Sequence, residues 1–182
     1  MLIYIAADHR GFALKEHLKN FLRESGYSVT DLGNEKLDEN DDYPDFAAEV
    51  GKRVSQEFET ARGIVVCASG VGVDIVVNKF PRVRSVLAAT SDQAYDSRND
   101  DDTNVLALGA EYLDLATAKK ILITWLETPF GDEPRFRRRI EKISRLEEKL
   151  YGTPGEEKHE REKPERGSGE TNEEELRGKL HW

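Results

Sequence analysis

Cys67 stands between a short apolar run and a glycine-rich turn, in the stretch GIVVCASGVGVDIVVNK at residues 63–79. Residues 64–67 are largely β-branched and too few for a helix, so they predict a buried strand. Residues 68–72 are small where the backbone must bend, and the apolar residues at 73–77 predict a helix. A thiol at a helix start has a lowered pKa, and its thiolate can serve as nucleophile or base. The alternative is that Cys67 is only a small buried residue that ends a strand.

The glycine turn after Cys67 also predicts an anion site. Unpaired backbone N–H groups at a helix start, where the helix dipole is positive, attract a negative group. The turn is not a Walker loop, because no Lys-Ser or Lys-Thr closes it, and it lacks the third glycine of the dinucleotide-binding pattern. Within this turn, Ser69 either relays a proton or simply ends the strand.

Alternating strand and helix patterns place these groups in a larger fold. Strands are predicted at 2–7, 27–32, 64–67, 84–89 and 104–108, and helices at 12–24, 43–54, 73–77, 92–97 and 115–126. This repetition predicts an α/β fold, a Rossmann-like open five-stranded parallel sheet with helices on both faces. Ligands of such sheets bind outside the carboxyl ends of the strands, so Asp8 and His9 join Cys67 as candidates.

The chain is expected to divide into a domain at residues 1–150 and a charged tail at 151–182. A last helix at 134–150 carries an apolar stripe that must pack somewhere. The tail mixes glycine, proline and both charge signs, with only three sizeable apolar residues from 152 onward, Leu176, Leu180 and Trp182. This composition predicts disorder. The tail either keeps the protein in solution or docks its last residues on a partner.

Composition excludes several classes of protein. A formal net charge of −9 argues against non-specific nucleic-acid binding. No apolar run is long enough for a membrane helix, and the N-terminus meets a charge too early for a signal peptide. Cys67 is the only cysteine, so no internal disulfide can form, and we expect a cytoplasmic protein. The spacing of the four histidines predicts no metal site.

Six motifs follow one another within residues 2–150: ADHRGFALKE, DYPDFA, CASGVGVDIVVNK, RSVLAA, DDTNVLALG and PRFRRRIEKI. Together and in this order they resemble the ribose-5-phosphate isomerase B and galactose-6-phosphate isomerase family of sugar-phosphate isomerases. The resemblance implies aldose–ketose isomerisation through an enediolate, without metal or organic cofactor. Ribose 5-phosphate and ribulose 5-phosphate are the first substrate pair to test. A hexose-6-phosphate isomerase and a non-catalytic sugar-phosphate-binding module are the alternatives.

The resemblance also implies roles for individual residues. Cys67 would be the base that moves a proton between C1 and C2 of the sugar. Asp8 and His9 would bind sugar hydroxyls or the ring oxygen, and Tyr43 would lie beside the ligand. Without the resemblance, these three fit a helix cap, a surface histidine and a packed aromatic equally well. The developing oxyanion would be held by five backbone amides, those of Ala68, Ser69, Gly70, Val71 and Gly72.

Arg135 and Arg139 lie one turn apart on the last helix, so they share a face that suits a doubly charged phosphate. The alternative is a solvated charged face. In the family this helix reaches the neighbouring subunit, which implies a homodimer or higher homo-oligomer with shared active sites. Burial of the apolar stripe of this helix would also favour such an assembly, independently of the resemblance.

Four positions depart from the ribose-5-phosphate enzymes. Asp100 falls where the family has the histidine credited with opening the furanose ring, and Asp101 replaces an asparagine. Glu111 replaces a phosphate-facing arginine, and Phe136 replaces a histidine. A carboxyl group can be the ring-opening acid only if neighbouring carboxylates or burial raise its pKa. We predict this role for Asp100; His9, or ring opening in solution beside a solvated Asp100, are the alternatives.

Overall fold

The computed structural model describes residues 1–152, so the expected tail lies outside the described residues except for its first two positions. Five parallel strands form one sheet in the order β2-β1-β3-β5-β4. The strands are β1 (Leu2–Ala7), β2 (Ser28–Asp31), β3 (Ala61–Cys67), β4 (Ser85–Leu87) and β5 (Val105–Gly109). The order places β3, which ends in Cys67, at the centre of the sheet.

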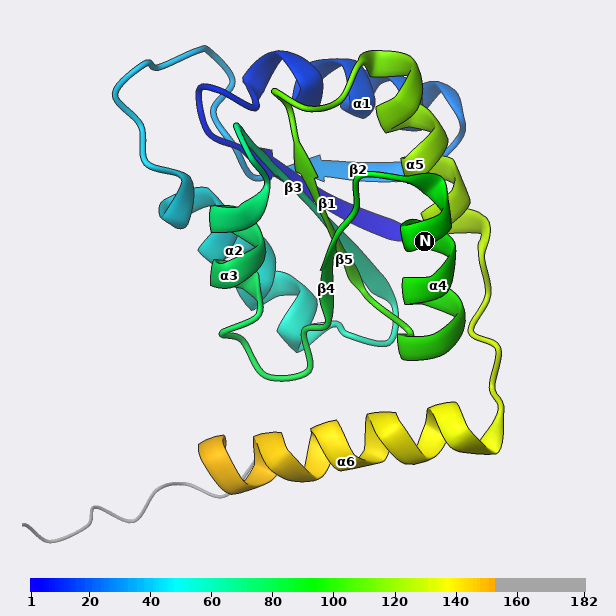
Figure 1. Ribbon diagram of the computed structural model, residues 1–182. Helices are drawn as coiled ribbons and strands as arrows, with labels where there is room; N and C mark the ends of the chain where they lie inside the picture. The colour runs from blue at the N-terminus through cyan, green and yellow to red at the C-terminus, as the bar shows by residue number, and fades with distance from the viewer. Residues whose placement is uncertain (153–182) are drawn as a thin grey trace, which may run out of the picture. The chain divides into compact units, whose positions relative to one another are not determined.

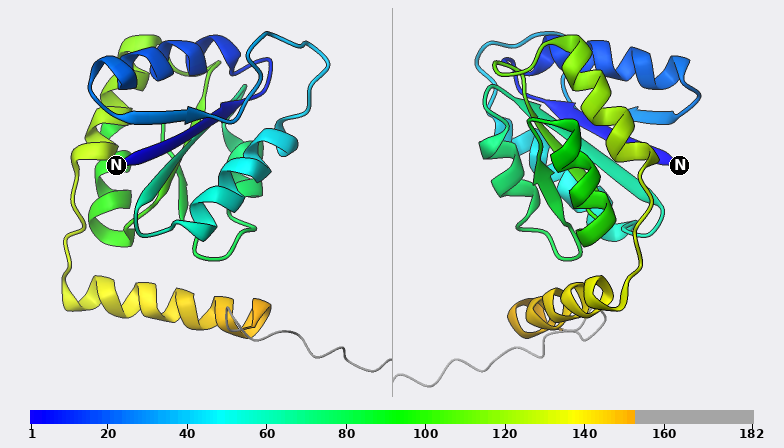
Figure 2. Two further views of the ribbon diagram at one scale, coloured as in Figure 1. Left: turned by 180° about the vertical axis from the view of Figure 1, so that it is seen from behind. Right: turned by 45° about the vertical axis from the view of Figure 1, so that its right-hand side comes forward.

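Helices cover both faces of this sheet (Figures 1 and 2). One face carries α1 (Phe12–Glu24), α4 (Ser91–Asp101) and α5 (Leu115–Glu127), and the other carries α2 (Tyr43–Gln56) and α3 (Val71–Val77). The last helix, α6, is Pro134–Tyr151. The predicted α/β class, with a five-stranded parallel sheet between helices, is confirmed.

Alternation along the strands divides the core into two parts. In β1, Ile3 and Ile5 pack toward α1 and α5, whereas Tyr4 and Ala6 pack toward α2. Side chains of successive residues point to opposite faces of a sheet, so both faces of a buried parallel strand must be apolar. Cys67 belongs to the part under α2 and α3.

Several elements are longer than the sequence predicts. β3 begins at Ala61 and α3 at Val71, and α4 extends to Asp101 rather than ending near residue 97. The helix α4 is almost entirely polar, so it has no apolar stripe by which its end can be read. Its start is fixed by Thr90, whose side chain accepts the N–H of Gln93 at 3.2 Å. Asp100 therefore lies in a helix and not in a loop.

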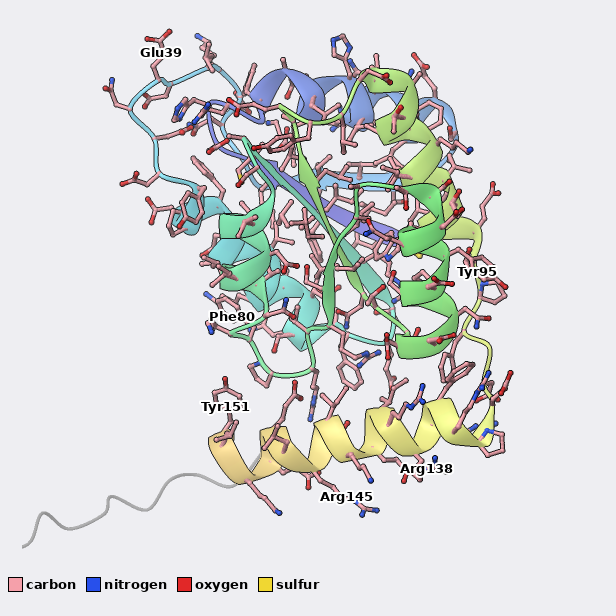
Figure 3. The ribbon with its side chains drawn as sticks, in the orientation of Figure 1. Glu39, Phe80, Tyr95, Arg138, Arg145 and Tyr151 are labelled. Carbon is pink, nitrogen blue, oxygen red and sulfur yellow. The ribbon has the colours of Figure 1, made fainter. Side chains whose placement is uncertain are left out.

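The helix α6 lies beyond the strand ends at which β4 and β5 begin (Figure 1). It is anchored by Phe136, which is 2% exposed, and by Glu147, which accepts the backbone N–H of Arg82 at 2.9 Å. Figure 3 shows Tyr151 on the side of α6 that faces the sheet and Arg145 pointing away from it. The predicted apolar stripe is only partly covered: three of its residues remain exposed, Ile143, Leu146 and Leu150.

Candidate active site

The loops that follow β1 and β3 lie against each other at the carboxyl edge of the sheet. Ala7 and Val66 are register partners at the ends of these strands. A Cβ added to Gly11 would lie 2.6 Å from the carbonyl oxygen of Val66, so only glycine permits this approach. The structure therefore brings Asp8 and His9 to the edge at which Cys67 ends β3.

The thiol of Cys67 is 4% exposed and lies inside the turn that follows it. The backbone N–H of Gly70 donates to Sγ at 3.1 Å, which stabilises negative charge on the sulfur. The N–H of Val71 donates to Oγ of Ser69 at 3.3 Å. Within residues 1–152 the amides of Ala68, Ser69 and Gly72 have no hydrogen-bond partner. Three of the five predicted oxyanion donors thus remain open to a ligand.

Gly70 adopts a left-handed conformation, with φ at 78°, and this shapes the turn. A Cβ at this position would lie 2.4 Å from Cδ1 of Leu87 and 2.9 Å from the nitrogen of Gly109. We predict that Gly70→Ala lowers the free energy of unfolding by more than the ~1–2 kcal/mol of left-handed strain alone. Gly26→Ala is the matched control, because Gly26 has φ at 85° but no neighbour within 4 Å. If urea unfolding showed the same loss of stability in Gly70→Ala and Gly26→Ala, crowding at position 70 would not contribute.

Tyr43, the first residue of α2, packs against the same turn. A Cβ added to Gly72 would lie 2.7 Å from the Tyr43 ring, so the glycine makes room for the aromatic side chain. Tyr43 is 38% exposed. The ring is therefore partly covered by the turn and partly open to a ligand.

Asp8 is 5% exposed, and its Oδ1 accepts the N–H of Gly11 at 2.8 Å. This bond closes the turn that leads into α1, although the N-cap of that helix is Gly11 and no side chain caps it, so Asp8 is not the helix cap that the sequence allowed. Its Oδ2 has no hydrogen-bond partner within residues 1–152. One carboxylate oxygen thus serves the fold, and the second is free to accept a hydrogen bond from a ligand.

His9 is held by Asp41, a residue that the sequence did not single out. Oδ1 of Asp41 accepts from the backbone N–H of His9 and contacts its Nδ1, each at 2.8 Å. The hydrogen bond to this carboxylate raises the pKa of His9 above its ordinary value, and the charge of Asp8 adds to the effect. Two aspartates precede Tyr43 in the run DDYP, but residues 32–42 show no periodicity to indicate which one turns inward.

Arg10 and Glu111 form an ion pair at the rim of this edge. The backbone N–H of Glu111 donates to the carbonyl of Ala68 at 3.0 Å, which places Glu111 beside the turn after Cys67. Both side chains are about half exposed. Arg10, from the loop after β1, therefore balances the charge of the Glu111 carboxylate.

The remaining predicted residues gather at the opposite edge of the sheet. Arg84, just before β4, donates to the carbonyl of Asp101 at 2.9 Å and fixes the end of α4 there. The pKa of Asp101 is raised by partial loss of solvent and by the neighbouring Asp100, while Arg139 acts in the opposite direction. The side chain of Asn99 donates to the carboxylate of Asp100 at 2.7 Å.

Phe136 explains how α6 presents its arginines. The guanidinium carbons of Arg135 and Arg139 lie 4.6 and 6.0 Å from the centre of the Phe136 ring. The ring is buried, and Phe130 lies next to it with 6.5 Å between ring centres. Phe136 thus acts as a platform for two cations.

Two separate groups result, one at each end of the sheet. Cys67 and Gly109 are paired at the carboxyl ends of β3 and β5, whereas Asp101 lies near the start of β5. Five residues of β5 separate these ends, which corresponds to roughly 16 Å of strand. One chain therefore does not bring Arg135, Arg139 and Asp100 to the thiol.

Residues 1–152 contain neither a metal-ligand cluster nor a helix that could span a membrane. Among residues 1–152, no three or more His, Cys, Asp or Glu side chains lie together so as to hold a metal ion. Over the same residues, none of the helices combines the length and the apolar character needed to cross a bilayer.

The fold and this carboxyl edge define a class: a parallel α/β protein with a buried thiol, open backbone amides and a histidine–carboxylate pair at the strand ends. The chain belongs to the ribose/galactose isomerase family, whose model matches residues 3–143. The resemblance seen in the motifs is confirmed.

Relatives agree with this assignment. The chain is 37% identical to a probable ribose-5-phosphate isomerase B of Mycoplasma genitalium, over 80% of this chain and 95% of the relative. It is 37% identical to ribose-5-phosphate isomerase B of Escherichia coli, over 81% and 97%. The crystal structure of the M. genitalium enzyme with bound ribulose-5-phosphate matches with a TM-score of 0.78, covering 81% of this chain and 96% of that one.

Proposed function

We propose that this protein is an isomerase that interconverts ribose 5-phosphate and ribulose 5-phosphate. The observation that carries the proposal is the thiol of Cys67 next to three open amides in a member of this family. A relative with this fold, 37% identical, binds ribulose-5-phosphate. We assign the activity to residues 1–150, treat 151–182 as an appended charged tail, and expect the protein to work in the cytoplasm.

The proposed chemistry is a proton transfer between neighbouring carbons. The Cys67 thiolate removes the proton from C2 of the open-chain aldose, and the electron pair moves to the carbonyl oxygen, forming an enediolate. The same thiol then returns the proton to C1. The amides of Ala68, Ser69 and Gly72 hold the oxyanion, and Ser69 carries protons between the two oxygens. The reaction as written needs no metal or organic cofactor.

The phosphate contacts require a second copy of the chain. Arg135 and Arg139 lie at the opposite edge from Cys67, so in our proposal a neighbouring subunit of a homodimer or larger assembly supplies them, with Asp100 and Asp101. The three exposed apolar residues of α6 give the contact an apolar surface to bury. Each active site would then combine the carboxyl edge of one protomer with α4 and α6 of its partner.

The Arg10–Glu111 pair predicts an unusual response to mutation. Removing the charge of Glu111 frees Arg10 and removes a like charge from the approach of the phosphate. We predict that Glu111→Gln lowers KM for the sugar phosphate by about twofold to fivefold, in line with an exposed ion pair. Glu24→Gln, the same change at the exposed far end of α1, should leave KM as it is. A KM that is unchanged or higher in Glu111→Gln would show that the phosphate does not reach Arg10.

A panel of aldose phosphates tests the proposed function. Ribose 5-phosphate and the hexose 6-phosphates are offered to the full chain, and ketose formation is measured alongside binding. We expect turnover of ribose 5-phosphate to exceed that of every hexose phosphate. Preference for a hexose 6-phosphate would reassign the substrate. Tight binding without turnover of any member would make the protein a sugar-phosphate-binding module.

A further inference from the structure

We propose that His9 is the acid that opens the sugar ring and that Asp41 is the positioning residue that orients it. This inference rests on the proposed function, because it concerns a step that precedes the proton transfer at Cys67. Ribose 5-phosphate is mostly a closed furanose, and the thiol acts only on the open chain. A proton donor at the carboxyl edge is therefore needed.

The geometry leaves one nitrogen of His9 free for this purpose. Asp41 engages Nδ1 and the backbone N–H with a single oxygen, so the ring is fixed at two points. Within residues 1–152 the other ring nitrogen, Nε2, has no hydrogen-bond partner. The side chain of His9 is 31% exposed and follows β1 next to the end of β3. This arrangement matches an acid–base histidine with a carboxylate behind it.

A chain of contacts holds Asp41 in place. Its Oδ2 accepts from the side chain of Asn34 at 3.1 Å, and the backbone carbonyl of Asn34 accepts from Nζ of Lys15 at 2.8 Å. Lys15 is fully buried and also donates to Asp31 at 2.8 Å. The Asp41 side chain itself is 8% exposed. A buried lysine in α1 thus fixes the loop that presents Asp41, which gives the histidine a rigid support.

Asp100 is less suited to donate a proton. An aspartic acid has an ordinary pKa near 3.9 and a histidine near 6.5, so near neutral pH an imidazolium is far more available than a protonated carboxyl. The amide of Asn99 donates to the carboxylate of Asp100 at 2.7 Å and so occupies one of its oxygens. The charged groups that act on His9 are Asp41 and Asp8, and both favour the imidazolium.

The ring-opening step balances without any further reactant. The bond between the anomeric carbon and the ring oxygen breaks, and its electron pair goes to the ring oxygen, which takes the proton from Nε2 of His9. The anomeric hydroxyl forms the aldehyde and gives its proton to water. The imidazole regains a proton from water. The products are the open-chain aldose and protonated His9.

The test compares ribose 5-phosphate with its analogue that lacks the 4-hydroxyl and so cannot close a ring. We expect Asp41→Asn to lower kcat for ribose 5-phosphate by about tenfold and His9→Gln by about 10²-fold. On the analogue, both variants should lose much less kcat than they lose on ribose 5-phosphate. In Asp41→Asn, an NMR titration should show a lower pKa for the imidazole of His9 than in the wild type. The fall of kcat on the basic side of its pH profile should also move to lower pH. Asp38→Asn, an exposed change of equal charge in the same loop, should do neither.

Two outcomes would overturn the inference. Equal loss on both sugars would make Asp41 and His9 general supports of the site. A loss confined to ribose 5-phosphate in Asp100→Asn, with Asp41→Asn and His9→Gln unaffected, would give the role to Asp100. Failure of the wild-type protein to isomerise either sugar would refute the proposed function itself, which is a separate result. Urea unfolding of each variant checks that the fold is retained.

Discussion

Replacing Cys67 with alanine is expected to leave a folded protein and to lower turnover of ribose 5-phosphate by about 10²-fold or more. The loss follows from removing the only group at the carboxyl edge that is placed to take the C2 proton in our proposal. The change is small in volume, and the turn keeps its shape through Gly70, so stability should fall little. Steady-state turnover measures the loss of activity, and urea unfolding of the same preparation measures the change in stability.

Cys67→Ser sharpens this test. Serine keeps nearly the same volume and can still accept the N–H of Gly70, but its hydroxyl does not ionise near neutral pH. Turnover should therefore fall as far as in Cys67→Ala. Activity retained by the serine variant would mean that position 67 only shapes the turn, and near-normal turnover in the alanine variant would remove Cys67 from the mechanism.

The second large effect is expected from mixing two inactive proteins. Cys67→Ala lacks the base, and the double variant Arg135→Ala/Arg139→Ala lacks the phosphate contacts. If each site takes its thiol from one protomer and its arginines from the other, a mixed dimer contains one intact site. Random reassembly of equal amounts in a dimer should then restore about a quarter of the wild-type turnover.

A control and a contrary outcome make the mixing experiment decisive. Mixing Cys67→Ala with Cys67→Ser should restore nothing, because every site still lacks the thiol. No recovery with the arginine variant, in mixtures shown to exchange subunits, would mean that each chain completes its own site. Full activity of the unmixed arginine variant would instead exclude Arg135 and Arg139 from substrate binding.

Much of the fold is predictable here because buried parallel strands and amphipathic helices carry strong patterns. β1 and α1 have the predicted bounds, since an apolar run and a clear apolar stripe define them. The end of α4 was not predictable, because an almost entirely polar helix has no apolar stripe to mark its last turn, and the cap at Thr90 fixes only its start. That error placed Asp100 in a loop.

The site was predictable only in part, because a sequence reveals the residues at the end of each strand but not which loops meet. Cys67, Asp8 and His9 could be assigned to one edge from topology alone. Asp41 could not, since its role depends on a loop held from α1 by Lys15. The pairing of Glu111 with Arg10 was not predictable either, because these residues are 101 positions apart in the sequence. Without this partner, the negative charge of Glu111 would oppose phosphate binding.

The buried ring of Phe136 has a consequence for the thermodynamics of anion binding by α6. A free arginine side chain carries about 2 kcal/mol of rotamer entropy, much of which is lost when the guanidinium is fixed on a ligand. In this structure Arg135 and Arg139 lie over Phe136 within one chain, so part of that loss occurs during folding. Binding an anion then costs less conformational entropy, and the helix is preorganised for the charge it receives.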